Sequence, residues 1–189
     1  MDKDTTEKII ITHAQFTGDY LQHELEQLGF RIQRKDHLHV EIRGTLKDAV
    51  RLNLMLRNAH RVLFHLHTTR SRTLNDLYVN IKRISWEEII PDNGYFSIHS
   101  YVRQQEIQDF RIVNLKAKDA IADRFFSKFE RRPDSGNQSD RLVLFIHWEH
   151  DLLQVYLDTS GESLSQRGYR IHSWKAPPAE SLATSILSA

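Results

Sequence analysis

Two hydrophobic periodicities alternate along the chain and predict an α+β fold. Apolar residues at every second position, or in unbroken runs of four to eight, indicate strands, and apolar residues three and four apart indicate helices. In the first third of the chain the order is strand, helix, strand, strand, helix, strand. The six segments are residues 8–13, 17–30, 30–34, 37–43, 44–58 and 61–68. This βαββαβ order is that of a split βαβ, or ferredoxin-like, unit.

Turn and capping residues locate the two helices of this unit. Thr17 stands where it can cap the first helix, and Gly29 stands where it can end it. The second helix opens at Gly44-Thr45. The positions about one turn apart in the second helix are Val50, Leu54 and Arg57. The leucines interpreted as structural are Leu52, Leu54 and Leu56.

The second part of the chain begins near residues 69–73, the best candidate for a linker. Helices are predicted over residues 74–83, 110–129 and from Pro178 onward, with a helical turn at 86–90. Strands are predicted over residues 95–102, 141–148 and 152–157. The last two strands are almost wholly apolar, which indicates a hairpin in the middle of a sheet. Residues 132–140 read as a polar loop. The apolar stripe of the longest helix is predicted to be Leu115, Ala122, Phe125, Phe126 and Phe129.

Composition narrows the class of protein. The 189 residues are 40% hydrophobic and 27% charged, which is typical of a folded chain long enough to bury a core. Lys and Arg number 26 against 25 Asp and Glu, so a general polybasic coat for nucleic acid is excluded. Cysteine is absent, which excludes disulfide scaffolds and thiol catalysis. No apolar run approaches the ~20 residues of a membrane helix, and the charged start is no signal peptide, so we expect a cytoplasmic protein.

Motifs for enzyme chemistry are missing. No two of the seven glycines lie within six residues of each other, so there is no GxGxxG and no phosphate-binding loop. His37 and His39, like His65 and His67, are two apart and share a strand face, but a metal site needs three or four converging ligands. We expect no catalytic residue, no metal ligand and no cofactor in this chain. A binding module is favoured, with a small histidine-based enzyme and a protein-binding adaptor as alternatives.

Five segments carry a resemblance to a known family. They are LNLMLRNAHR at 52–61, Asp76-Leu77-Tyr78 followed by Trp86, LKAKDAIAD at 115–123, LDTSGESLSQRGYR at 157–170 and KAPPAESLATSIL at 175–187. In this order they resemble the N-terminal half of bacterial 23S ribosomal RNA guanine-N2 methyltransferases that carry a THUMP domain. The resemblance implies a ferredoxin-like domain over 1–70, a THUMP α/β domain over 71–172, and the start of a linker or helix over 173–189.

The same resemblance implies an activity that lies outside this chain. The family continues into a Rossmann-like methyltransferase domain with Asp-Pro-x-Cys-Gly-Ser-Gly-Thr and Asn-Pro-Pro-Tyr motifs, and neither motif is present. S-adenosylmethionine is therefore expected for the full-length protein and no cofactor for this chain. The implied partners are structured RNA, ribosomal RNA before tRNA, and the protein's own C-terminal methyltransferase domain, with no membrane and no DNA. The alternative is a stand-alone THUMP-type RNA-binding adaptor or a tRNA-modification module.

Candidate RNA-binding cations gather in and after the longest helix. Residues 103–132 carry eight Lys or Arg and five Asp or Glu. The candidates there are Arg103, Lys116, Lys118, Arg124, Lys128, Arg131 and Arg132. Arg124 and Lys128 are four apart and share a helix face, which Arg131 and Arg132 extend. Cations near a helix C-terminus also complement its dipole, and nearby aspartates can pair with them, so charge alone leaves both interpretations open.

A second candidate segment is Arg167-Gly168-Tyr169-Arg170. Arg167 and Arg170 offer phosphate contacts and Tyr169 a stacking ring, although docking on the catalytic domain is the favoured alternative. Trp86 is interpreted as a core residue. One departure from the family stands beside the long helix: members usually carry a glycine before Arg-Pro, and Arg131-Arg132-Pro133 lacks it, so the turn there is expected to differ.

Overall fold

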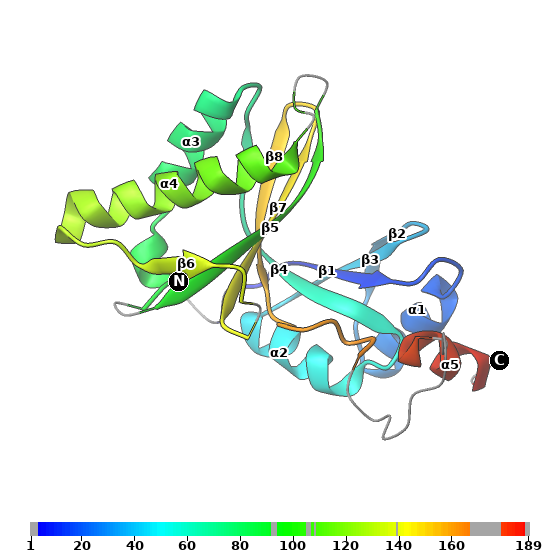
Figure 1. Ribbon diagram of the computed structural model, residues 1–189. Coiled ribbons are helices and arrows are strands. Elements are labelled where there is room, and N and C mark those ends of the chain that lie inside the picture. Colours follow the sequence, from blue (N-terminus) through cyan, green and yellow to red (C-terminus); the bar gives the residue numbers. More distant parts are fainter. Residues whose placement is uncertain are drawn as a thin grey trace. The chain divides into compact units, whose positions relative to one another are not determined.

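The structure is a computed structural model that describes residues 4–91, 94–104, 107, 109–138, 140–166 and 179–187 (Figure 1). Its contacts divide the chain into two units. One consists of Asp2–Phe64 and Glu162–Ala189, and the other of His65–Gly161. Each unit is described by itself below. The boundary falls within one strand, because β4 runs over Ala59–Arg70.

The first unit has the predicted βαββαβ order. Its strands follow the order β2-β3-β1-β4, and every neighbouring pair is antiparallel. The pairing places Ile9 opposite Ile42 of β3 and opposite Phe64 of β4. The elements are β1 (Glu7–His13), α1 (Gly18–Gln27), β2 (Ile32–Lys35), β3 (His39–Gly44), α2 (Leu46–Met55), the first half of β4, and α5 (Glu180–Leu187). The ferredoxin-like prediction for this region is confirmed.

Of the three leucines interpreted as structural in and after α2, Leu52 and Leu56 are buried and Leu54 is exposed. Val50 is 52% exposed and Leu54 77% exposed, whereas Ala49 and Leu52 are fully buried. The Thr45 side chain accepts a hydrogen bond from the Asp48 amide, and the Asp48 side chain accepts one from the Thr45 amide. This capping box fixes where the helix begins.

The predicted tail helix is present as α5, and it packs by polar contacts within the first unit. Ser181 and Ser185 are buried. The Ser185 hydroxyl donates to Oδ1 of Asn58 at 2.7 Å, and the Ser181 hydroxyl lies 3.0 Å from Nε2 of His60. These contacts hold α5 against the chain that leads into β4.

The second unit is a sheet with helices on one side. Its strand order is β4-β8-β7-β5-β6, with β7 and β8 antiparallel and β5 parallel to both β6 and β7. The elements are the second half of β4, α3 (Leu74–Arg83), the 3-10 turn η1 (Trp86–Glu88), β5 (Tyr95–Arg103), α4 (Phe110–Phe129), β6 (Asp134–Gly136), β7 (Leu142–Glu149) and β8 (Leu152–Asp158). The prediction that the hairpin lies inside the sheet is confirmed.

Two segments of this unit differ from their predicted form. Residues 132–140 contain the short strand β6, which the polar composition concealed. In residues 69–73, the candidate linker, β4 continues to Arg70, residues 71–72 are irregular, and Thr73 caps α3 in a capping box with Asp76. Between them Ser71 is buried, and its carbonyl accepts a hydrogen bond from Nε1 of Trp148 at 2.9 Å.

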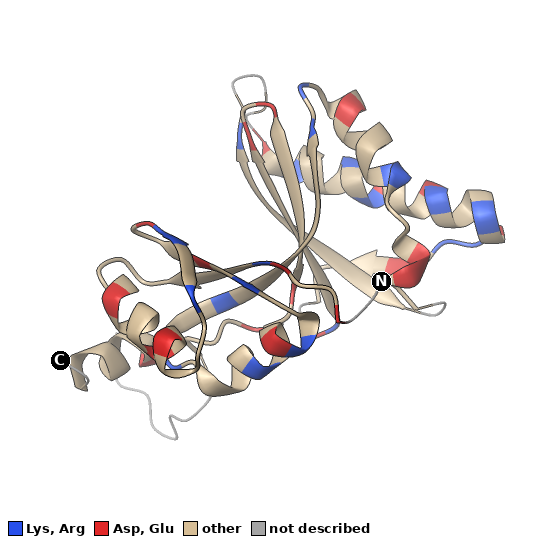
Figure 2. Cartoon of the chain, turned by 180° about the vertical axis from the view of Figure 1, so that it is seen from behind, with Lys and Arg blue, Asp and Glu red and all other residues tan. Residues whose placement is uncertain are grey.

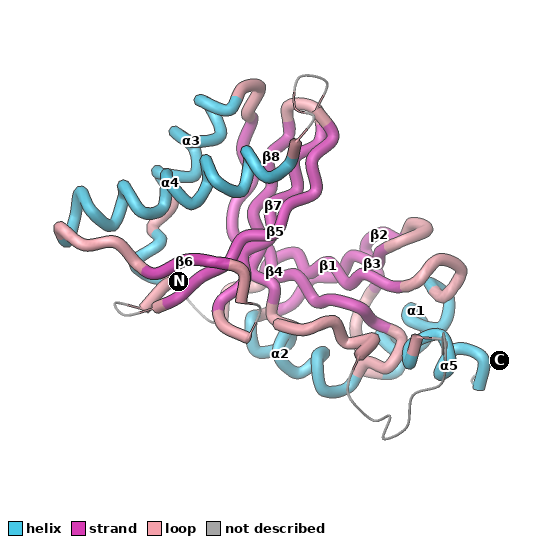
Figure 3. The backbone as a smooth tube through the Cα atoms, in the orientation of Figure 1, coloured by secondary structure: helices cyan, strands magenta, loops and turns pink. Residues whose placement is uncertain are grey.

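Helices α3 and α4 lie on the same side of this sheet and form its core with alternate strand residues (Figure 3). Trp86 is fully buried, which confirms its interpretation as a core residue. The predicted stripe of α4 is wrong in three positions, because Leu115, Phe126 and Phe129 are exposed. The helix buries a different stripe, consisting of Val113, Ala117, Ala120, Ile121 and Phe125.

Candidate nucleic-acid interface

Helix α4 ends in a reversal that brings two arginines over two exposed phenylalanine rings. Glu130 has φ 55° and ψ 21°, the left-handed conformation that glycine usually supplies at a helix end. Glu130 adopts this conformation without glycine's freedom from a Cβ, one position before the place where the family usually carries glycine. Past Glu130, the guanidinium of Arg131 lies 6.0 Å from the Phe129 ring centre, and that of Arg132 lies 5.6 Å from the Phe126 ring centre.

The second arginine is also held by a carboxylate. Nη2 of Arg132 lies 3.0 Å from Oδ1 of Asp123, and the Arg132 side chain keeps 62% of its area exposed. The other oxygen of Asp123 accepts a hydrogen bond from the Tyr78 hydroxyl at 2.7 Å, which raises the pKa of Tyr78. Nζ of Lys116 lies 4.8 Å from the centre of that tyrosine ring. Contacts thus link Lys116, Tyr78, Asp123 and Arg132 between α3, α4 and the turn that follows α4.

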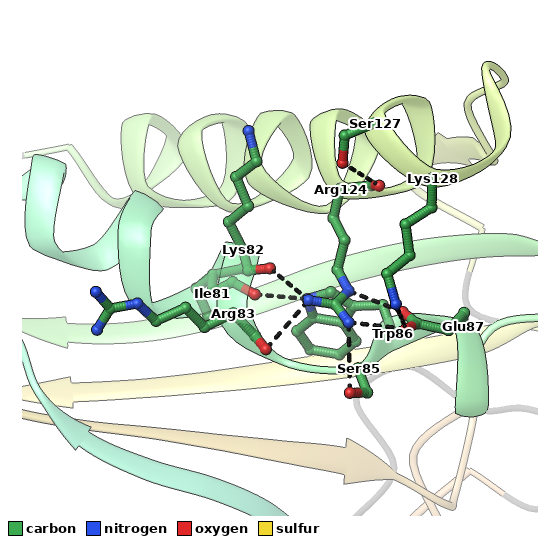
Figure 4. Close-up of polar contacts among 9 residues, drawn as sticks. All are labelled: Ile81, Lys82, Arg83, Ser85, Trp86, Glu87, Arg124, Ser127 and Lys128. Carbon is green, nitrogen blue, oxygen red and sulfur yellow. Dashed lines mark hydrogen bonds and ion pairs between the residues drawn. The ribbon is translucent and has the colours of Figure 1, made fainter.

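Arg124, six residues before Glu130, is engaged in hydrogen bonds within the protein. Its Nε and Nη2 donate to the two oxygens of Glu87 at 2.8 and 2.7 Å (Figure 4). Its Nη1 donates to the carbonyls of Lys82 and Arg83, the last residues of α3, at 3.1 and 3.2 Å. Arg124 therefore caps carbonyls that a helix end leaves without partners. Its side chain is only 15% exposed.

The same carboxylate also holds Lys128. Figure 4 shows Arg124 and Lys128 reaching from α4 to Glu87 of η1. The hydrogen bonds from Arg124 and Lys128 hold the pKa of Glu87 far below its ordinary value, although burial opposes this. Bonding to Glu87 likewise raises the pKa of Arg124. Arg124 and Lys128 do share a helix face, as predicted, and both side chains bind the carboxylate of Glu87.

Two further candidate cations, Arg103 and Lys118, do not contact Glu87 or the phenylalanine rings within the part of the chain that the structure describes, and each has its own partner. Nη1 of Arg103 pairs with Oε1 of Glu149 at 3.1 Å and the arginine is 69% exposed. Nζ of Lys118 donates to the Gly136 carbonyl of β6 at 3.0 Å. Figure 2 shows basic positions along α4 and in the segment that follows it. Arg167 and Arg170 lie outside the described residues.

Sequence reasoning did not predict that Phe126 and Phe129 are exposed beside the arginines. Phe126 is 53% exposed and Phe129 44%, although both were assigned to the core. The available signal was that α4 has apolar residues on more than one face, so burying Phe125 leaves Phe126 outside. Aromatic rings next to arginines are surfaces on which nucleic-acid bases can stack.

The described residues do not fit a cofactor or metal site. The β5–α4–β6 crossover is where a parallel sheet would hold a nucleotide-like cofactor, but its connection, residues 104–109, has no glycine. The N-terminus of α4 is capped by the Asp109 carboxylate, which accepts from the Arg111 amide and pairs with its guanidinium. Within the described ranges, no three His, Asp or Glu side chains are arranged to hold a metal ion. None of the described helices is both long and apolar enough to span a membrane.

Comparison with known proteins agrees with the two units. The model of the RlmL ferredoxin-like domain matches residues 8–63, and the THUMP domain model matches residues 71–158. The chain is 31% identical over 180 residues to the ribosomal RNA large subunit methyltransferase K/L of Syntrophotalea carbinolica and 33% identical over 167 residues to that of Methylococcus capsulatus. These matches cover 95% and 88% of this chain.

The chain corresponds to only a part of these relatives. It spans 25% and 23% of the two curated relatives. Among solved structures, that of SMU.472 complexed with SAH superposes with a TM-score of 0.83 at 25% identity. This match covers all of this chain and 49% of that one.

Proposed function

Because this chain carries the RlmL ferredoxin-like domain followed by a THUMP domain, we propose that it is the RNA-holding N-terminal region of an S-adenosylmethionine-dependent ribosomal RNA guanine-N2 methyltransferase. The observation that carries the proposal is that both domains occur in order and that both curated relatives are large-subunit ribosomal RNA methyltransferases. These relatives favour ribosomal RNA over tRNA and over a stand-alone adaptor. The proposed domains span 1–70 and 71–172, and 173–189 leads toward the catalytic domain.

In this proposal methyl transfer belongs to the part of the protein that this chain does not span. The described residues do not fit S-adenosylmethionine, so their task is to bind and orient RNA in the cytoplasm. The RNA-contacting group would be centred on the end of α4. It would comprise Lys116, Arg131 and Arg132, beside the rings of Phe126 and Phe129, with Lys128 next to them but bound to Glu87. Arg103, Lys118, Arg167 and Arg170 are further proposed contacts, and Arg124 serves mainly to hold α3.

Phosphate contacts give this proposal a measurable signature. Each cation that neutralises a phosphate releases counterions, so log K falls linearly with log salt. With a net charge of +1 we expect the 189-residue chain to bind a 23S ribosomal RNA stem–loop with a Kd on the order of micromolar at low salt. Fluorescence anisotropy over a salt series gives both the affinity and the slope.

The double variant Arg131→Glu/Arg132→Glu tests the proposed surface. It should weaken binding about tenfold or more and reduce the salt slope by about 2, because two phosphate contacts are lost. Arg51→Glu/Arg57→Glu is the matched control, with the same charge change at two exposed positions of the first unit. Equal losses in both variants would mean that only net charge matters, and no RNA binding by the wild-type chain would refute the proposed function.

A further inference from the structure

The sheet of the second unit has a face that its own helices do not cover. Residues Phe96, Ile98, Leu144, Ile146 and Trp148 belong to the core that α3 and α4 form on one side. Because side chains alternate along a strand, the residues between them point to the opposite side. On that side lie His99, Tyr101 and Arg103 of β5, Phe145, His147 and Glu149 of β7, and Leu152 and Gln154 of β8, followed by Tyr156, which is buried. Figure 1 shows α3 and α4 on the other side of these strands.

At the centre of the exposed part of this face, two rings are stacked. Tyr101 and His147 are register partners on the parallel strands β5 and β7. Their ring centres are 5.1 Å apart and their planes differ by 14°. Tyr101 is 49% exposed, so about half of this residue's surface is open to solvent while His147 holds the ring in place. A ring held by its neighbour loses little freedom when another ring stacks on it.

Polar groups lie beside the stack, together with the apolar Phe145, and the charges at the strand ends balance. His99 is exposed beside Tyr101 on β5, and Gln154 of β8 is the register partner of His147. At the strand ends Arg103 and Glu149 form an ion pair at 3.1 Å. Hydrogen-bonding groups beside an aromatic plane suit the edges of an unpaired base, since base recognition in RNA combines stacking with contacts to base edges. A face without excess positive charge would contribute chiefly by stacking, and Arg103 is the one cation of this face proposed to contact RNA.

We infer that the Tyr101–His147 stack is a binding site for an unpaired RNA base. The inference rests on the proposed function, because it takes RNA as the ligand. It adds that an RNA loop or bulge binds at a surface separate from the α4 cations. The α4 cations would hold the backbone, and the strand face would select RNA with an unstacked base.

The test uses the 189-residue chain and an RNA stem–loop with 2-aminopurine in the loop. We expect wild-type protein to change the 2-aminopurine fluorescence, and Tyr101→Ala to remove that change and weaken loop binding about five- to tenfold or more. The salt slope should stay the same, since no phosphate contact is lost. Tyr101→Phe should behave as wild type because it keeps the ring. Phe110→Ala is the control, as this phenylalanine is 55% exposed on α4.

A second readout does not depend on the variants folding. The stem–loop with 5-bromouridine in the loop is photocrosslinked to wild-type protein, and the adduct is located by mass spectrometry. An adduct within residues 95–103 or 142–149 supports the inference. The inference fails if wild type binds RNA but Tyr101→Ala keeps full affinity, or if the adducts fall only elsewhere. The proposed function would then stand, and contact with a protein would become the alternative use of this face. If wild type binds no RNA, both fail.

Discussion

Two adjacent stretches at the end of α4 carry the same kind of side chain in opposite circumstances. Arg124 and Lys128 converge on the carboxylate of Glu87, and Arg124 is largely buried. Arg131 and Arg132 follow within eight residues, lie over exposed phenylalanine rings, and Arg132 keeps most of its area in solvent. A count of cations along the chain treats the four as equal. Their partners divide them into a pair that holds the fold together and a pair presented at the surface.

The difference shows what charge spacing can and cannot reveal. Spacing of four residues places two cations on one helix face, but it does not say what that face meets. Here it meets an anion 37 residues away from Arg124 in sequence. The surface pair is distinguished by geometry that begins with the backbone conformation of Glu130.

The largest expected change in stability comes from replacing one of two neighbouring phenylalanines of α4. Phe125→Ala should lower the free energy of unfolding by about 3–5 kcal/mol, because the ring is 1% exposed and its removal leaves a cavity. Phe126→Ala should cost about 1 kcal/mol or less, since the ring is 53% exposed. Urea titration followed by circular dichroism measures both. Similar losses would mean that both rings are packed in the core.

Removing the charge of Glu87 tests whether Arg124 is a structural residue. Glu87→Gln should lower the free energy of unfolding by about 2 kcal/mol, because the guanidinium loses its charged partner while remaining largely buried. The double variant Arg131→Glu/Arg132→Glu, by contrast, should leave stability nearly unchanged. Thermal unfolding of the three proteins provides the comparison. Unchanged stability in Glu87→Gln would show that Arg124 is not needed to hold α3.

Lowering the pH should gradually remove the contribution of Glu87 to the free energy of unfolding. Down to pH 4 this loss should be smaller than the effect of Glu87→Gln. The folded-state pKa of Glu87 is held well below its ordinary 4.5, so the pair stabilises the protein above that pH and the stabilisation is lost as pH falls toward the folded-state pKa. Between pH 7 and pH 4 the loss should be on the order of 1 kcal/mol. The pKa of four other carboxyls is lowered too: Asp19, Asp36, Asp76 and Asp109.

The contribution of Glu87 is isolated by subtraction. The stability difference between wild type and Glu87→Gln should be largest at neutral pH and shrink as pH falls, because Glu87 becomes protonated in the unfolded wild-type chain and Gln does not titrate. The other carboxyls titrate in both proteins and cancel. A difference that is constant from pH 7 to pH 4 would contradict the depressed pKa. The measurement is a set of urea titrations at fixed ionic strength.

Element order and the bounds of the strongest helices could be predicted from the sequence. Helices α3 and α4 occupy residues 74–83 and 110–129 as predicted, and each has a capping residue before it, Thr73 and Asp109. The short strand β6 could not be found this way, since three residues, Asp-Ser-Gly, carry no period. Its pairing with β5 depends on residues about 40 positions away.

The sides of the helices were harder to predict than their ends. In α2 and α4 apolar residues occur on more than one face, so the pattern does not choose between them. Tertiary packing selects Leu52 over Leu54 and Phe125 over Phe126. For the same reason the candidate surface could be predicted as a list of cations, but its aromatic members could not. The Tyr101–His147 stack lies in strands of the predicted hairpin and its neighbour, yet it depends on a register that the sequence does not state.

The left-handed turn at Glu130 has a consequence for the energetics of ligand capture. It folds the chain back so that Arg131 and Arg132 rest on rings of the preceding turn instead of extending freely into solvent. Long side chains lose rotamer entropy when a partner immobilises them, and each such loss weakens association. Arginines already confined on phenylalanine faces have less of that freedom left to lose.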